Sequence, residues 1–211
     1  MITLIKLQSL FEKLASKGMR QVFEDWEMLV GFQAKATCEP VQIIASADDA
    51  AASLGAKHVL VETQVLRGDE AIGPIHFAFP DPLVIEIIGD LLMIPEAMRD
   101  EKTKTGLTEG DLEAFQEMAN LLCGSWNRVF QELDCDLKIS QSVDDLRVLP
   151  SGDDVGALVE HAGAGRKAWL SYEVSAADGT FPLAQVIPFD VTIAIAEEFL
   201  GERDPRSATG T

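Results

Sequence analysis

The stretch Asp111–Phe130, DLEAFQEMANLLCGSWNRVF, has the spacing of a long amphipathic helix. Its apolar side chains form a stripe suited to burial, made of Phe115, Ala119, Leu122, Trp126 and Val129. Because successive helical residues are about 100° apart, a second set falls together on the opposite side, made of Glu113, Glu117, Asn120 and Gly124. Asn and Gly each cost about 0.5–1 kcal/mol relative to Ala in a helix interior. Their place on the polar stripe therefore indicates that something docks there.

Before this helix, the first half of the chain has a definite order of patterns. We expect, in order, a helix at about 2–29 that breaks or bends around Gly18, a strand at about 32–44, a loop at 45–56 and a hairpin across the turn Arg67–Glu70. Asp81 and Pro82 should start a further helix as its cap and first-turn proline, and Pro95 should end it. The charged stretch 95–110 then joins this half to the next.

The second half repeats this order. We expect, in order, a helix at about 109–132, a strand at about 136–149, a loop at 150–165, a hairpin across Ala177–Gly179 and a last helix that Asp190 caps and Gly201 ends. Matching residues recur 105–109 positions apart, among them Val22-Phe23 with Val129-Phe130, Ser46 with Ser151, Lys57 with Arg166, Asp69 with Asp178 and Asp81 with Asp190. Such self-similarity indicates an internal duplication.

The duplicated order predicts an α+β fold of a particular kind. Tight turns between strands make antiparallel pairs, and the alternation of apolar side chains leaves one face of the sheet for helices. We therefore expect two pseudo-two-fold helix–three strands–helix units that form one antiparallel six-stranded sheet covered by helices. A single domain should span 1–201, with repeats at about 1–95 and 108–201, and the polar tail 202–211 should be disordered.

Composition narrows the classes of function. The formal net charge of −18 argues against nucleic acid or an anionic membrane as a partner. The N-terminal stretch lacks the apolar block of a signal peptide and no apolar run reaches transmembrane length, so we expect a cytoplasmic protein. Three cysteines without CxxC spacing and three scattered histidines predict neither a disulfide framework nor a metal site. A duplicated chain already contains a pseudo-dimer, which is compatible with a monomer.

The polar stripe supports a specific kind of chemistry. A carboxylate and a carboxamide one turn apart, Glu117 and Asn120, can divide two tasks. The carboxylate can pair with a cation on a partner, and the carboxamide, which donates and accepts hydrogen bonds, can hold a water molecule in a fixed orientation. Orienting a water in line with a phosphoryl group is a known use of an uncharged amide. Because an acyl phosphate is already reactive, orientation alone can lower its hydrolysis barrier by several kcal/mol.

On these residues the sequence resembles the CheC/CheX/FliY chemotaxis phosphatases, which dephosphorylate the response regulator CheY. Their signature is Asp or Ser, three residues, Glu, two residues and Asn. Here Glu117 and Asn120 occupy the Glu and Asn positions, and Gly124 matches a glycine that often follows. The repeated order helix–three strands–helix is also similar to the CheC-like fold. The sequence departs from the signature in placing Glu113 at the Asp or Ser position. A proline often follows the family's signature and would be expected near Val143, whereas here it appears only at Pro150.

The resemblance implies a mechanism. Asn120 would insert beside the phospho-aspartate of a CheY-type receiver domain and orient the attacking water, while Glu117 would pair with the receiver's phosphate-site lysine. Glu113 and Gly124 would contact the partner, and Gly124 would let the partner's backbone approach closely. Mg²⁺ would belong to the receiver, so we expect no metal or other cofactor bound by this chain itself.

The sequence leaves two other functions open. Flagellar motor-switch proteins such as FliM share this fold and bind CheY without hydrolysing it, so a receiver-binding module is an alternative. A scaffold with a vestigial site is another, because the first helix lacks the motif: at a separation of 107, Glu113, Glu117 and Asn120 fall on Lys6, Leu10 and Lys13. A contact surface on that helix would face an acidic partner through its basic residues, Lys6, Lys13, Lys17 and Arg20.

Overall fold

The computed structural model of the protein describes residues 2–49, 57–149, 154–177 and 179–201. Within these ranges the helices are α1 (Leu4–Val30), the 3-10 turn η1 (Ala47–Asp49), α2 (Asp81–Leu91), α3 (Glu96–Thr105), α4 (Glu109–Glu132), α5 (Asp154–His161) and α6 (Phe189–Leu200). The strands are β1 (Ala34–Cys38), β2 (Gln42–Ile44), β3 (His58–Arg67), β4 (Glu70–Pro80), β5 (Leu137–Leu149), β6 (Lys167–Ala176) and β7 (Gly179–Pro188). None of the described helices is long and apolar enough to cross a membrane. The predicted disordered tail, 202–211, lies outside the described residues.

The described strands form one antiparallel sheet with the order β1-β6-β7-β4-β3-β5, and the short β2 pairs with the other end of β6. The first strand of each half pairs with the hairpin of the other half: β1 with β6, and β5 with β3. The two hairpins meet at the centre, where β4 pairs with β7. Each half therefore completes the sheet of the other, and the predicted duplicated α+β architecture is confirmed.

The centre of the pseudo-two-fold lies where Phe77 on β4 pairs with Gln185 on β7, two residues 108 positions apart. The junctions between strand and helix repeat at the same separation, with Pro80 before α2 and Pro188 before α6. Both prolines occupy the N-cap position with extended backbone torsions, which proline adopts readily. The separation between equivalent residues at the sheet centre is thus one residue shorter than the separation of 109 that the sequence matches give.

A bulge accounts for this difference. The register between β3 and β4 shifts between Val65 and Leu66, which adds one residue to β4, whereas the β6–β7 register runs without a shift. The predicted match of Asp81 with Asp190 is therefore wrong by one residue. Neither aspartate occupies an N-cap position, and neither helix start has a side-chain cap hydrogen bond.

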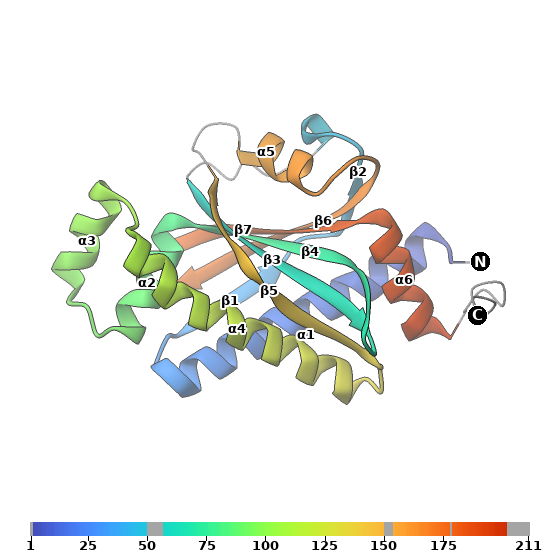
Figure 1. Ribbon diagram of the computed structural model, residues 1–211, viewed down its shortest axis with the longest axis horizontal. Helices are drawn as coiled ribbons and strands as arrows, with labels where there is room; N and C mark the ends of the chain where they lie inside the picture. The colour runs from blue at the N-terminus through green and yellow to red at the C-terminus, as the bar shows by residue number, and fades with distance from the viewer. Residues whose placement is uncertain (1, 50–56, 150–153, 178, 202–211) are drawn as a thin grey trace.

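Helices lie on both faces of the curled sheet (Figure 1). α1 and α4 cross one face next to each other, α5 lies over the other face, and α2 and α6 pack at opposite ends. The larger core lies beneath α1 and α4 and contains buried aromatic side chains, among them Trp26, Phe77, Phe79, Phe115 and Trp126. A smaller core lies beneath α5 and contains Leu60, Ala78, Leu158, Trp169 and Val186. The sheet is therefore covered on both faces, not on one.

Two helices lie where the sequence predicted none. α5 falls in the predicted loop 150–165, and it is stabilised by burying Leu158 and Val159 in the smaller core. α3 falls in the predicted connection and has no buried residue. Both helices depend on tertiary contacts, because α5 has only eight residues and α3 is mostly charged, and neither pattern is strong by itself.

Arg99 holds α3 against the rest of the molecule. Its guanidinium donates to Glu86 at 2.9 Å and to Asp90 at 2.7 Å, both on α2. Its Nε also donates to the carbonyl of Ile94 at 2.9 Å. The charged sequence of α3 therefore forms a surface helix through ion pairs with α2, whereas the sequence indicated a long connection.

The predicted strand at about 32–44 is divided into β1 and β2. Pro40 lies in the gap and cannot donate a backbone hydrogen bond to the sheet. Glu39 continues the pairing with a hydrogen bond from its N–H to the carbonyl of Ser171 at 2.9 Å. Both segments then pair with β6, so the interruption bends the edge of the sheet without ending it.

Gly18 is a point of close contact between α1 and α4. α1 runs through this residue as one helix, so the predicted break is wrong. A Cβ atom at Gly18 would lie 2.4 Å from the Trp126 ring, a distance that real Cβ contacts do not show. Glycine is therefore needed at this position because any side chain would force the two helices apart.

A buried carboxylate joins the same two helices. Asp25 of α1 is 2% exposed and accepts hydrogen bonds from Ser125 at 2.5 Å and from Arg128 at 2.9 Å, both on α4. Gln21 donates a third hydrogen bond to it at 3.0 Å. A buried carboxylate is tolerated only when its oxygens are bonded, so these contacts fix the position of α4 along α1.

The N-terminus of α4 is anchored by a capping box. Thr108 and Asp111 exchange hydrogen bonds between side chain and backbone, and Lys102 of α3 donates to both oxygens of Asp111 at 2.7 Å. Burial alone would raise the pKa of Asp111, but the hydrogen bonds from Lys102 and Thr108 outweigh it and hold that pKa below the usual 3.8. α4 is therefore fixed at its first turn as well as at its C-terminal half.

We expect Gly18→Ala to lower the free energy of unfolding and Gly124→Ala to raise it. A Cβ at Gly18 meets Trp126, whereas a Cβ at Gly124 meets nothing within 4 Å. Overpacking costs about 1–3 kcal/mol, and replacing an exposed helical glycine by alanine gains about 1 kcal/mol. Urea denaturation of both variants beside the wild type measures the contrast. Shifts of the same sign in the two variants would contradict it.

We expect Asp111→Asn to make stability less sensitive to acid. Because the folded pKa of Asp111 is lowered, its ionised carboxylate favours folding, and this contribution is lost as the pH falls through the folded pKa. The variant should be less stable than the wild type at about pH 7, and the difference should shrink as the pH falls below 3.8 and through the lowered pKa of the folded state. Unfolding free energies measured across this range test the prediction, which fails if the difference between the proteins is constant.

Candidate functional site

α4 exposes one narrow line of residues. Its other sides are covered by α1, α2 and β5. All four residues that the sequence singled out are exposed and lie on this line: Glu113, Glu117, Asn120 and Gly124. Gly110 precedes them at helical spacing and is also exposed. These five residues are called the α4 ridge below.

The glycines of the α4 ridge have no role inside the protein. A Cβ atom at Gly110 or at Gly124 would meet nothing within 4 Å, in contrast to Gly18. Neither of the two has the positive φ that would require glycine. Sequence reasoning missed Gly110, although the helical spacing that placed Gly124 on the stripe also places Gly110 there. A mid-helix glycine costs about 1 kcal/mol, and no contact among the described residues accounts for Gly124.

The two asparagines on α4 differ in whether the fold uses their side chains. Asn127 donates its amide hydrogen to the carbonyl of Ile139 at 2.8 Å and accepts from the N–H of Ile139 at 2.6 Å, which ties α4 to β5. Asn120, two turns earlier, is exposed and makes no hydrogen bond with another described residue. The fold therefore explains Asn127 and leaves Asn120 unexplained.

The two carboxylates of the α4 ridge are also uncommitted. Glu113 and Glu117 are exposed and form no ion pair with the described part of the chain. The ridge thus presents two anionic groups and one amide on a helix that is fixed at both ends. Such an arrangement can bind a cationic group and hold a water molecule, but it offers no nucleophile and no imidazole for proton transfer.

The corresponding surface of α1 has a different character. Lys13, the counterpart of Asn120, is exposed, and Leu10, the counterpart of Glu117, is partly buried. Lys17 forms an ion pair with Glu132 of α4 at 2.9 Å. α1 therefore keeps the packing role of its repeat without the polar set, as the sequence alignment of the halves predicted.

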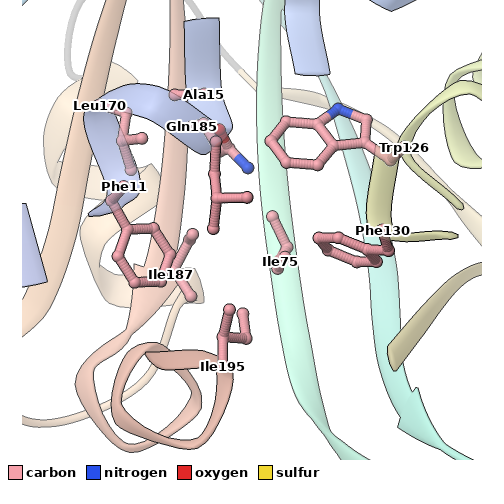
Figure 2. Close-up of a pocket in the computed structure, with 10 residues that line it drawn as sticks. Phe11, Ala15, Ile75, Trp126, Phe130, Leu170, Gln185, Ile187 and Ile195 are labelled. Carbon is pink, nitrogen blue, oxygen red and sulfur yellow. The ribbon is translucent and has the colours of Figure 1, made fainter. Parts of the chain in front are cut away.

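A small cavity lies between α1, α4, α6 and the sheet (Figure 2). Its volume is about 10 Å³, and apolar side chains such as Phe11, Ile75 and Ile195 line most of it. The amide nitrogen of Gln185 points towards it and has no hydrogen-bond partner among the described residues, while the oxygen accepts from Tyr172 at 2.5 Å. A space of this size holds one water at most, so it is not a substrate pocket.

The cysteines do not contribute reactive thiols. Cys123 and Cys135 are buried, Cys38 is partly buried, and all three cysteines are free. Burial raises the pKa of Cys38 and that of Cys123 to about 12, and it also raises the pKa of Cys135. Their thiols are therefore protonated at neutral pH and unsuited to nucleophilic attack.

Two of the three histidines come together, contrary to the expectation that they are scattered. His76 on β4 and His161 at the end of α5 both approach the carboxylate of Glu62 on β3. The hairpin turn alone would pair Glu62 with Ile75, and only the bulge between Val65 and Leu66 shifts the register so that Glu62 lies opposite His76. No pattern in the sequence places His161 beside them.

Comparison with known proteins identifies the fold. No protein-family model and no curated protein sequence matches the chain. Among solved structures, FliY of Thermotoga maritima is similar with a TM-score of 0.70 and 16% sequence identity, covering 96% of this chain and 100% of that chain. A chain of the FliM–SpeE complex from H. pylori is similar with a TM-score of 0.67 and 9% identity, covering 97% of this chain and 99% of that one.

A third similar structure comes from the FliG–FliM complex of H. pylori. Its TM-score is 0.65 at 9% identity, and the match covers 91% of this chain and 100% of that chain. The three matches cover 91–97% of this chain, so both halves contribute to the similarity. The chain therefore has a CheC/CheX/FliY-type fold.

Proposed function

We propose that this protein binds a CheY-type receiver domain through the α4 ridge and hydrolyses the phospho-aspartate of that receiver. One observation carries the proposal. Asn120 is an exposed amide that the fold does not use, and it lies between Glu117 one turn before it and Gly124 one turn after it. This set has the composition of the phosphatase signature that the sequence resembles.

The chemistry requires little from the enzyme besides orientation. A water oxygen attacks the phosphorus, the bond from phosphorus to the aspartyl oxygen breaks, and the products are inorganic phosphate and an aspartate carboxylate. A carboxylate is a stable leaving group, with a pKa of about 4 for its acid, so no general acid is needed. An amide in place of histidine suits this reaction, because its oxygen can accept a hydrogen bond from the water and so direct a lone pair of the water oxygen at phosphorus.

Glu117 and Gly124 would serve the docking. The carboxylate of Glu117 lies one turn from Asn120 and would pair with the lysine beside the receiver's phosphate, which fixes Asn120 relative to phosphorus. Gly124 leaves the helix surface open, so a segment of the partner's backbone can approach α4 closely. Mg²⁺ would be held by the receiver, where it would neutralise charge on the phosphoryl oxygens.

A second function, receiver binding without turnover, is favoured by Glu113. The signature has Asp or Ser at this position, and glutamate extends the carboxylate by one methylene on an exposed part of α4. A longer contact at the edge of the phosphate site could hold the receiver at a distance at which Asn120 does not reach the attacking water. The protein would then resemble a motor-switch module in its action.

We expect Asn120→Ala to abolish accelerated dephosphorylation while leaving receiver binding within a few-fold of the wild type. Loss of one group that orients or stabilises the transition state costs about 10²–10³ in rate. Release of inorganic phosphate from phosphorylated CheY-type receivers measures turnover, and fluorescence anisotropy measures affinity. Lys13→Ala, at the two-fold-related position on α1, is the matched control and should retain full activity.

Three results are informative for this experiment. Normal turnover by Asn120→Ala would refute the role of the amide. Tight binding by the wild type without faster phosphate release would favour the second function. Absence of both binding and turnover across a panel of receivers would refute the docking of receivers on the α4 ridge.

We expect Gly124→Ala to weaken receiver binding although it stabilises the fold. An added methyl group would separate the helix from the partner's backbone, and affinity should fall about tenfold or more. Glu101→Ala, an exposed substitution on α3 outside the ridge, serves as a control and should leave the affinity unchanged. If Gly124→Ala raises stability without changing affinity, Gly124 is not part of the contact.

A further inference from the structure

We propose that Glu62, His76 and His161 form a binding site for a zinc ion. The imidazole Nε2 of His161 lies 2.9 Å from Oε2 of Glu62, and Nδ1 of His76 lies 3.5 Å from the same oxygen. One donor atom of each residue lies within 4.8 Å of the others. The two imidazole rings meet edge to face with their centroids 5.1 Å apart. Three donors of the kinds that zinc prefers therefore converge on one point.

The fold assembles this site from three distant segments. Glu62 and His76 are directly opposite each other in the β3–β4 ladder, so their side chains share one face of the sheet. His161 ends α5, which lies over that same face. Leu60 and Ala78 continue the two strands into the smaller core beneath α5. The site lies on the face opposite to α1 and α4, so it is independent of the proposed phosphatase site.

The distances are compatible with a shared metal ion. At 3.5 Å, the contact between His76 and Glu62 is longer than a good N–H···O bond, which is about 2.7–3.2 Å. Ligand atoms about 2.0–2.1 Å from a tetrahedral zinc are roughly 3.3 Å apart, and the two distances of 2.9 and 3.5 Å lie on either side of this value. The two imidazole nitrogens lie within 4.8 Å of each other and must approach for tetrahedral coordination.

Burial divides the site into a fixed part and an accessible part. The side chain of His76 is 1% exposed, so its ring is held in place by the surrounding core. Glu62 and His161 are each 22% exposed, so an ion can enter from solvent, and a water can complete the coordination. Two imidazoles and one carboxylate suit zinc and disfavour Mg²⁺, which prefers oxygen ligands.

Zinc at this position would clamp α5 onto the sheet. α5 is a short helix whose described anchorage is the smaller core and the contact of His161 with Glu62. A metal would connect the end of this helix, in the second half of the chain, to the hairpin of the first half. The expected role of the zinc ion is structural, because the free energy of its binding to the folded state adds directly to the stability of that state.

The test uses the whole 211-residue chain after treatment with a chelator. Titration of zinc against a chromophoric competitor should show one ion per chain, and the melting temperature should rise with zinc and fall again with chelator. His161→Ala and Glu62→Gln should each weaken zinc binding by more than about 100-fold. Residues that only hydrogen-bond to a metal ligand already contribute about 10–100-fold to metal affinity, and loss of a ligand itself should cost more. Mg²⁺ should neither compete nor stabilise.

Controls separate this site from adventitious binding. His58→Gln alters the remaining histidine and should retain one zinc ion, as should Cys38→Ser, which removes the most accessible thiol. Cobalt substituted for zinc should show visible absorption bands without a thiolate charge-transfer band. Circular dichroism in the presence of chelator should show that Glu62→Gln, which preserves side-chain volume, remains folded. Equal zinc affinity of wild type and both ligand variants, or no stoichiometric binding by the wild type, would overturn the proposal.

Discussion

The contact between Gly18 and the Trp126 ring sets the distance between α1 and α4, and the exposure of the α4 ridge depends on it. The two helices approach closely enough to bury Asp25 with its partners on α4, while Asn127 ties the same helix to β5. α4 is thus held by packing, by a buried carboxylate and by a strand. A helix fixed in this way presents its exposed residues in one orientation, which lowers the entropic cost of docking a partner.

The duplication explains how one helix acquired a polar ridge while the core that both helices build stayed intact. Both α1 and α4 contribute a buried stripe to the larger core, so the fold constrains only one side of each helix. On the other side, α1 has Lys13 where α4 has Asn120. Because exposed positions contribute little to stability, the two copies could diverge there while the exchange of β1 and β5 kept the sheet intact.

The elements that could be predicted are those with a strong local pattern. The bounds expected for α4, about 109–132, coincide with the observed helix, whose start also has a capping box of Thr108 and Asp111. The two hairpins were predicted for the same reason, since turn residues and alternating strands are local signals, although the bulge that shifts the β3–β4 register was not predicted. α3 and α5 were missed because ion pairs of Arg99 and burial of Leu158 stabilise them, and neither contact follows a period in the sequence.

The sequence by itself determined the apolar stripe of α4, the polar ridge opposite it and the pairing of β3 with β4. These features depend on residues close together in the chain, for which helical and strand periods are sufficient. Only the tertiary structure decided that Asn127 is engaged by β5 while Asn120 is not, and that His161 reaches Glu62. The physical reason is that such contacts join segments whose relative positions follow from how whole helices and strands pack, which no local period encodes.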